Sequence, residues 1–160
     1  MAKDALKHLH YTLRKKGKTV SVAESCTGGI ISGLLTQLPG SSQFFILGIV
    51  TYNNTAKAKI LGISPRLIAK KGAVSGEVAQ RMAISVRKLS GADFGIGITG
   101  IAGPGGATTQ QPLGTVFIAI ASKKNVALRK FKFSGDRPMV RKKSARKALE
   151  MLGLLLDKVK

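Results

Sequence analysis

The segment Ser25–Gly29 is the first part of the sequence whose residue types could do chemistry. It places a hydroxyl, a thiol and two glycines between an apolar strand-like run and an apolar helix-like run. Main-chain N–H groups at a helix start are unpaired and favour an anion, and glycines let a ligand approach the backbone closely. The spacing matches neither the Walker phosphate loop nor the dinucleotide fingerprint. The segment therefore predicts either a ligand contact through Cys26, Thr27, Gly28 and Gly29, or a tightly packed helix start.

Lys57 and Tyr52 form a second candidate group, five residues apart across a predicted strand-to-helix junction. A lysine acts as a base when burial lowers its pKa. The only histidines, His8 and His10, lie in the first helix and are interpreted as surface or packing residues. Lysine is therefore the natural candidate for a general base, the alternative being an ordinary solvated lysine. Cys26 is either a nucleophile or a small buried residue.

The third candidate is a glycine cluster, with four glycines within the eight residues from Thr99 to Gly106. Such a run can form a concave nest of N–H groups for a phosphate or carboxylate, or it can be a plain connection. Two arginines at the start of the last predicted helix, Arg137 and Arg141, are four apart and could share a face aimed at a phosphate.

Composition excludes several other kinds of site. The chain has 160 residues, and its seven Asp and Glu are scattered, so no local motif forms a carboxylate cage for Mg²⁺ or Ca²⁺. One cysteine and two histidines cannot build a structural zinc site, and one cysteine forms no internal disulfide. With no apolar signal segment at the N-terminus and no stretch long enough to cross a bilayer, we expect a cytoplasmic protein without a membrane partner.

Charge is the unusual property, because 27 Lys and Arg against 7 Asp and Glu give a formal net charge of +20. Between Lys123 and Lys147 there are eleven basic residues and one acid, Asp136. This excess indicates either a nucleic-acid footprint or a solvated basic surface, and its wide distribution favours the surface.

The elements that must position these residues alternate between strands and helices, and then end with a hairpin and a long helix. Strands are predicted over residues 19–23, 44–52, 93–98, 113–121 and 126–133, and helices over 3–16, 30–38, 53–61, from 64, from 75 and from 137. This order predicts one three-layer α/β/α domain over residues 1–160, with a mixed, mostly parallel sheet of about five strands. Ligands gather at the carboxyl ends of strands in such sheets, where all three candidate groups fall.

Several motifs together resemble one known family, the CinA C-terminal domain family. They occur in the same order over essentially the whole chain and are Ala23–Gly29, Pro39–Ser42, Gly48–Asn53 with Lys57, Leu61–Gly62, Gly72–Ser75, Thr99–Gly106, Pro112–Val116 and Gly135–Arg137. Two features depart from the family's usual pattern, namely segment 107–111, which is more polar and acidic in relatives, and the strong positive charge.

The resemblance implies a three-layer α/β/α fold and nicotinamide mononucleotide deamidase activity, in which the substrate amide becomes nicotinic acid mononucleotide and ammonia in pyridine nucleotide salvage. It implies no metal and no cofactor, a small nucleotide as the partner, and a tendency to form homo-oligomers. The chain corresponds to the deamidase-like domain without the larger N-terminal domain of full-length relatives, as expected of a stand-alone form.

With this resemblance, the hypothesis for the site is amide hydrolysis. Ser25 attacks the carboxamide carbon, Lys57 with Tyr52 moves the proton, and N–H groups at Gly28 and Gly29 stabilise the oxyanion. The residues expected to hold the ribose phosphate are Thr99, Gly100, Gly103 and Gly105, helped by Ser42 and Arg137. Direct attack by a water that Ser25 positions is the alternative mechanism. Two other functions stay open, a nucleic-acid binder without catalysis and an inactive pocket that senses a nucleotide.

Overall fold

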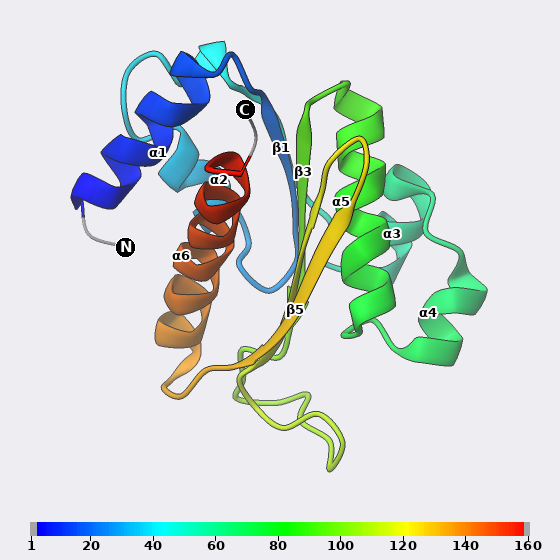
Figure 1. Ribbon diagram of the computed structural model, residues 1–160. Helices are drawn as coiled ribbons and strands as arrows, with labels where there is room; N and C mark the ends of the chain where they lie inside the picture. The colour runs from blue at the N-terminus through cyan, green and yellow to red at the C-terminus, as the bar shows by residue number, and fades with distance from the viewer. Residues whose placement is uncertain (1–2, 159–160) are drawn as a thin grey trace.

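The structure, a computed structural model, describes residues 3–158 and forms a three-layer α/β/α domain around a five-stranded sheet (Figure 1). The strands are β1 (Val20–Glu24), β2 (Phe45–Val50), β3 (Phe94–Gly100), β4 (Thr115–Ala121) and β5 (Val126–Lys132). The helices are α1 (Lys3–Lys15), α2 (Ile30–Leu35), α3 (Asn54–Leu61), α4 (Pro65–Lys71), α5 (Gly76–Ser90), α6 (Arg137–Leu156) and a short 3₁₀ turn, η1 (Ser41–Gln43).

The sheet has the order β2-β1-β3-β4-β5 and is mixed, as the sequence predicted. β1 pairs parallel with both β2 and β3, whereas β4 runs antiparallel to β3 and β5. Four of the five strands therefore point the same way. The carboxyl ends of β1, β2 and β3 meet at one edge of the sheet, which places the loops that follow them side by side.

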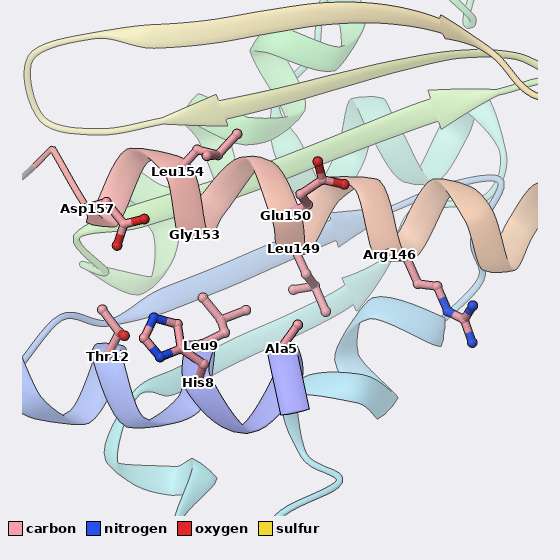
Figure 2. A pocket seen from close by; sticks show the side chains of 10 residues that line it. All are labelled: Ala5, His8, Leu9, Thr12, Arg146, Leu149, Glu150, Gly153, Leu154 and Asp157. Atoms are coloured by element: carbon pink, nitrogen blue, oxygen red, sulfur yellow. The ribbon is translucent and has the colours of Figure 1, made fainter. Parts of the chain in front are cut away.

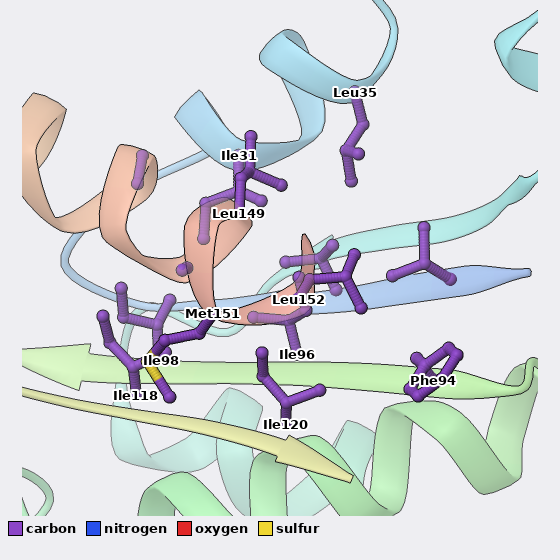
Figure 3. Packing of buried hydrophobic residues seen from close by; sticks show 14 of the residues in the cluster. Ile31, Leu35, Phe94, Ile96, Ile98, Ile118, Ile120, Leu149, Met151 and Leu152 are labelled. Atoms are coloured by element: carbon purple, nitrogen blue, oxygen red, sulfur yellow. The ribbon is translucent and has the colours of Figure 1, made fainter. Parts of the chain in front are cut away.

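Helices α1, α2 and α6 cover one face of the sheet, and α3, α4 and α5 cover the other (Figure 1). On the first face, Ile96 and Ile98 of β3 pack with Leu149 and Leu152 of α6 and with Ile31 of α2 (Figure 3). These side chains are almost completely buried, so this face holds the larger core and fixes where α2 and α6 start relative to the strand ends.

On the second face, α5 approaches β3 so closely that two glycines are required. A Cβ at Gly95 or Gly97 would collide with main-chain atoms of α5, at Ala83 and Ala79 respectively. This contact fixes the start of α5, which Ser75 caps by accepting a hydrogen bond from Val78 N. The segment before α5 is thereby held beside the end of β3.

Some element boundaries differ from the sequence-based prediction. The helix expected over 30–38 ends at Leu35, because Thr36 Oγ1 donates to the carbonyls of Ser32 and Gly33 and closes the last turn. β3 continues through Thr99 to Gly100, since pairing with β4 extends as far as Val116. Thr99 and Gly100 thus belong to a strand, and the glycine loop begins at Ile101. Within residues 3–158, no helix is both long and apolar enough to cross a membrane.

Candidate active site

The site starts from Ser25, the first residue after β1. Its N–H donates to Ile98 O of β3 over 3.1 Å, which fixes the serine at the edge where β1, β2 and β3 end. Lys57 enters from the second turn of α3, whose N-cap Asn53 accepts from Ala56 N over 2.7 Å. Lys57 Nζ lies 3.2 Å from Ser25 Oγ. The structure therefore brings together two of the predicted catalytic side chains, which are 32 positions apart in sequence.

Lys57 is a buried lysine, with only 1% of its surface exposed. Its Nζ also donates to Thr51 O over 2.9 Å and to Tyr52 O over 3.0 Å, and no carboxylate of the described residues forms an ion pair with it. Burial disfavours the charged form and lowers the pKa of Lys57 below its usual value of 10.5, against a smaller opposing effect of the Cys26 thiol. A neutral Lys57 keeps two N–H bonds for the two carbonyls, and its lone pair then faces Ser25.

Tyr52 contributes to this arrangement through its backbone rather than through its hydroxyl. Its carbonyl accepts from Lys57, whereas its ring is half exposed and its Oη accepts from Arg137 Nη2 over 2.6 Å. Arg137 Nη1 donates to Gly103 O over 2.7 Å. The arginine therefore joins the loop after β3 to Tyr52, the second residue after β2, whose carbonyl accepts from Lys57.

The amides at the start of α2 are not free, which corrects the prediction for Gly28 and Gly29. The Glu24 carboxylate, itself fully buried, accepts from the N–H groups of Gly29, Ile31 and Ser32 and from Ser32 Oγ. Gly28 N donates to Ser25 O over 3.1 Å. The sequence places an acid five residues before Gly29, and a strand followed by a tight turn brings such an acid back over the helix start.

Within the described chain, the main-chain amide of Thr27 has no hydrogen-bond partner, and that of Cys26 interacts only with its own thiol. They directly follow Ser25, and the buried Thr27 hydroxyl is also without a partner among residues 3–158. These groups, rather than the two glycine amides, are the donors beside Ser25 that a substrate oxygen could meet.

The residues predicted to hold a phosphate occupy different positions along the loop after β3. Thr99 is buried, and its hydroxyl donates to Ala73 O over 2.9 Å, so its hydrogen holds the segment before α5 instead of facing a phosphate. Gly100 ends β3. Gly103 has φ +87° and presents its carbonyl to Arg137, while Gly105 is exposed with open space around it.

Two predicted residues have surroundings that differ from the hypothesis. Ser42 lies in η1, which precedes β2 and is therefore at the opposite end of the sheet from Ser25 (Figure 1). Ser42 thus does not join the cluster within this chain. Cys26 packs in the core beneath α2 and α6, and burial raises the pKa of its thiol to about 12. A thiol with such a pKa is protonated at neutral pH, so Cys26 is a packing residue and not a nucleophile.

Arg141 is the residue at this edge whose role the sequence did not predict, although its spacing from Arg137 placed both on one face. Its Nε donates to Cys26 O over 3.1 Å and its Nη2 to Thr27 O over 2.7 Å. Among residues 3–158, neither arginine has a carboxylate within ion-pair distance. The edge therefore carries two guanidinium groups that hydrogen-bond to neutral groups and form no ion pair with a carboxylate of residues 3–158.

Two cavities lie between helices. One of about 690 Å³ lies between α3 and α4, and its lining includes Asn54 and Ala73 but not Ser25, Lys57 or Thr99. The other, of about 350 Å³, lies between α1 and α6 and is lined by Leu9, Leu149 and Gly153 among others (Figure 2). Neither cavity is lined by a predicted site residue. The described residues hold no cluster of three or more His, Cys, Asp or Glu side chains.

The fold and the edge cluster define a class of protein, namely a three-layer α/β domain with a buried Ser–Lys pair where three parallel strands end. The model of the CinA C-terminal domain matches residues 2–156, and the chain belongs to that family. The family resemblance found in the sequence is thereby confirmed.

Solved structures agree with this assignment. The competence/damage inducible protein CihA from Agrobacterium tumefaciens is 38% identical, with a TM-score of 0.92 and coverage of 96% of this chain and 94% of that one. The competence damage-inducible protein A from Klebsiella pneumoniae is 30% identical, with a TM-score of 0.94 and 98% of each chain covered.

Longer relatives match this chain over only one part of their own length. A CinA-like protein of Geotalea uraniireducens is 50% identical over 128 residues, which are 80% of this chain and 30% of that protein. A CinA-like protein of Geobacter metallireducens is 48% identical over 139 residues, or 87% of this chain and 34% of that protein. The chain thus spans about a third of the length of these relatives.

Proposed function

We propose that this domain hydrolyses the carboxamide of nicotinamide mononucleotide, giving nicotinic acid mononucleotide and ammonia. The observation that carries the proposal is the buried Lys57 beside Ser25, since a lysine held away from water and from carboxylates loses its proton more readily than a free lysine and is suited to act as a base. The family membership supports the proposal, because the activity is the one that the sequence resemblance implies.

In the proposed reaction, neutral Lys57 takes the Ser25 proton as Oγ forms a bond to the carboxamide carbon. The tetrahedral intermediate carries its negative charge on oxygen, which the amides of Cys26 and Thr27 would stabilise. Lys57 then gives the proton to the amide nitrogen, the C–N bond breaks and ammonia leaves. A water, deprotonated by Lys57, attacks the resulting ester and releases the carboxylic acid together with the regenerated Ser25 hydroxyl.

The charge at the edge supports an anionic substrate such as a phosphate monoester. Arg137 and Arg141 form no ion pair with a carboxylate of the described residues, and a phosphate would be attracted to their field. The cavity between α3 and α4, at about 690 Å³, is in the size range of small-molecule sites, and Ala73 in its lining accepts a hydrogen bond from Thr99.

The alternative mechanism is direct attack by a water that Ser25 positions. Mass spectrometry after rapid acid quenching separates the two, since only the serine mechanism forms an ester between Ser25 and the carboxyl group of nicotinic acid mononucleotide, with the ribose phosphate still attached. The function itself is tested by measuring ammonia release from nicotinamide mononucleotide by the wild-type chain, with the Ser25→Ala variant as the comparison.

The net charge of +20 favours a second candidate, a protein that binds nucleic acid without catalysis. Its affinity for duplex DNA would fall steeply with salt and would not depend on Ser25 or Lys57. Titration of a labelled duplex at two salt concentrations, with wild type and Ser25→Ala, distinguishes this function from hydrolysis.

A further inference from the structure

We infer that Arg141 is a positioning residue that sets the conformation of the Ser25 turn for catalysis. The inference rests on the proposed function, because it assigns a role within the same site. Its basis is the pair of hydrogen bonds from one guanidinium to two consecutive carbonyls, Nε to Cys26 O at 3.1 Å and Nη2 to Thr27 O at 2.7 Å.

These two bonds determine the direction of the amides that follow. In a trans peptide the C=O and N–H groups point in opposite directions. With Cys26 O held by Arg141, the N–H of Thr27 points away from the arginine, and it has no partner among the described residues. With Thr27 O held as well, the N–H of Gly28 points away and donates to Ser25 O over 3.1 Å. Arg141 thus closes the turn on Ser25 and presents the Thr27 amide.

The turn is held from both helical layers. Arg141 reaches it from α6, and Lys57 reaches Ser25 Oγ from α3, on the other face of the sheet (Figure 1). Ser25 Oγ is thereby fixed within 3.2 Å of the amine that activates it. A displacement of the turn by about 1 Å would lengthen this contact, and such misplacements cost roughly 100-fold in rate.

Gly28 has a conformation and surroundings that agree with this role. Its φ of +58° is in the left-handed region, and a Cβ there would lie 2.9 Å from Arg141 Nη2. A side chain at position 28 would therefore adopt a strained backbone conformation and would push the guanidinium from its place. A lysine at position 141 would keep the positive charge. Its ammonium has one nitrogen, so it could not donate to the two carbonyls from two separate nitrogens as the guanidinium does.

The test compares Arg141→Lys and Arg141→Ala with Lys142→Gln, a control that removes a charge from the next, exposed residue of α6. We expect kcat for ammonia release to fall about 100-fold in Arg141→Lys with less than threefold change in KM, and guanidinium ion to restore part of the activity of Arg141→Ala. Lys142→Gln should behave as wild type. Thermal unfolding of each variant reports whether the fold is retained.

A second readout does not depend on the substrate. The rate at which a fluorophosphonate labels Ser25, followed by mass spectrometry, should fall in parallel in Arg141→Lys at unchanged thermal midpoint. Equal labelling of wild type and Arg141→Lys, or no labelling of wild-type Ser25, overturns the inference. Labelling that depends on Arg141 together with absent ammonia release retains the inference and rejects the proposed substrate.

Discussion

At the scale of single residues, the site depends on what surrounds one amine. Lys57 is buried, hydrogen-bonded to two carbonyls and 3.2 Å from Ser25 Oγ. The sequence indicated Lys57 as a base only by elimination, because burial of a side chain depends on elements that pack around it from distant parts of the chain. For the same reason, nothing in the sequence distinguished a nucleophilic Cys26 from a buried one.

The first prediction concerns the pH dependence that Lys57 gives to catalysis. Since burial lowers its pKa below 10.5, the amine loses its proton at a lower pH than a free lysine, and kcat should rise with pH through that ionisation. Lys57→Met should lose at least about 1,000-fold in kcat. The measurement is the pH–rate profile of ammonia release, with the exposed Lys70→Met variant as control. A profile without an acidic limb, or an active Lys57→Met, would contradict the assignment.

The second prediction concerns Cys26, whose pKa of about 12 keeps the thiol protonated. Iodoacetamide at pH 8 should leave the folded chain unmodified, and it should alkylate Cys26 once denaturant is added. Cys26→Ala should keep kcat within about threefold of wild type, at a cost of about 1 kcal/mol in the free energy of unfolding. Rapid alkylation of the native chain would show that the thiol is accessible and reactive.

At the scale of elements, the amides of the turn between β1 and α2 bind a carboxylate of the protein itself, whereas the sequence analysis expected them to bind the oxyanion of a substrate. The Glu24 carboxylate accepts hydrogen bonds from the N–H groups of Gly29, Ile31 and Ser32. The sequence predicted the turn, the strand before it and the helix after it, and it predicted that the three loops converge. It did not predict which group pairs with the amides, because that depends on the direction in which the side chain leaves the end of β1.

The third prediction follows from this contact. Glu24→Ala should lower the free energy of unfolding by about 3 kcal/mol or more, since it leaves three amides of α2 without a buried acceptor. Glu24→Gln should lose less, because one amide oxygen remains as an acceptor. Urea unfolding of the two variants measures the difference. Equal and small losses would indicate that water satisfies these amides just as well.

The fourth prediction concerns α1, which contributes the buried His10. Its ring contacts Phe44 edge-on at 4.8 Å between centroids, and its Nε2 has no partner within residues 3–158. Burial lowers the pKa of His10 below 6.5, against a smaller effect of its hydrogen bond to the Leu34 backbone. As the pH falls through 6.5, the unfolded chain takes up the proton first, so the free energy of unfolding decreases.

Thermal or urea unfolding at pH 7.5 and pH 5 measures this decrease. His10→Leu should remove a part of it, and the exposed His8→Gln should leave it unchanged. A pH dependence that is the same in His10→Leu and wild type would show that other groups cause it.

At the scale of the whole molecule, the three-layer class, the mixed sheet and the family all followed from patterns in the sequence. Strand–helix alternation and the Lys123–Asn125 hairpin are local signals, and a parallel sheet can connect such elements in few ways. Ser42 was assigned to the site because it belongs to a motif that occurs in the family's order. Motif order does not say at which end of the sheet a residue lies, and η1 lies before β2, at the other end from Ser25. Arg141, whose partners are more than 100 positions away, required the packing of α6.

The central claim is tested most directly by one assay of the purified chain. Ammonia release from nicotinamide mononucleotide should be measured for wild type and for Ser25→Ala, with thermal unfolding of both to establish that they are folded. We expect steady turnover by wild type and a loss of at least about 1,000-fold in the variant. A folded wild-type chain that releases no ammonia, or a Ser25→Ala variant as active as wild type, would contradict it.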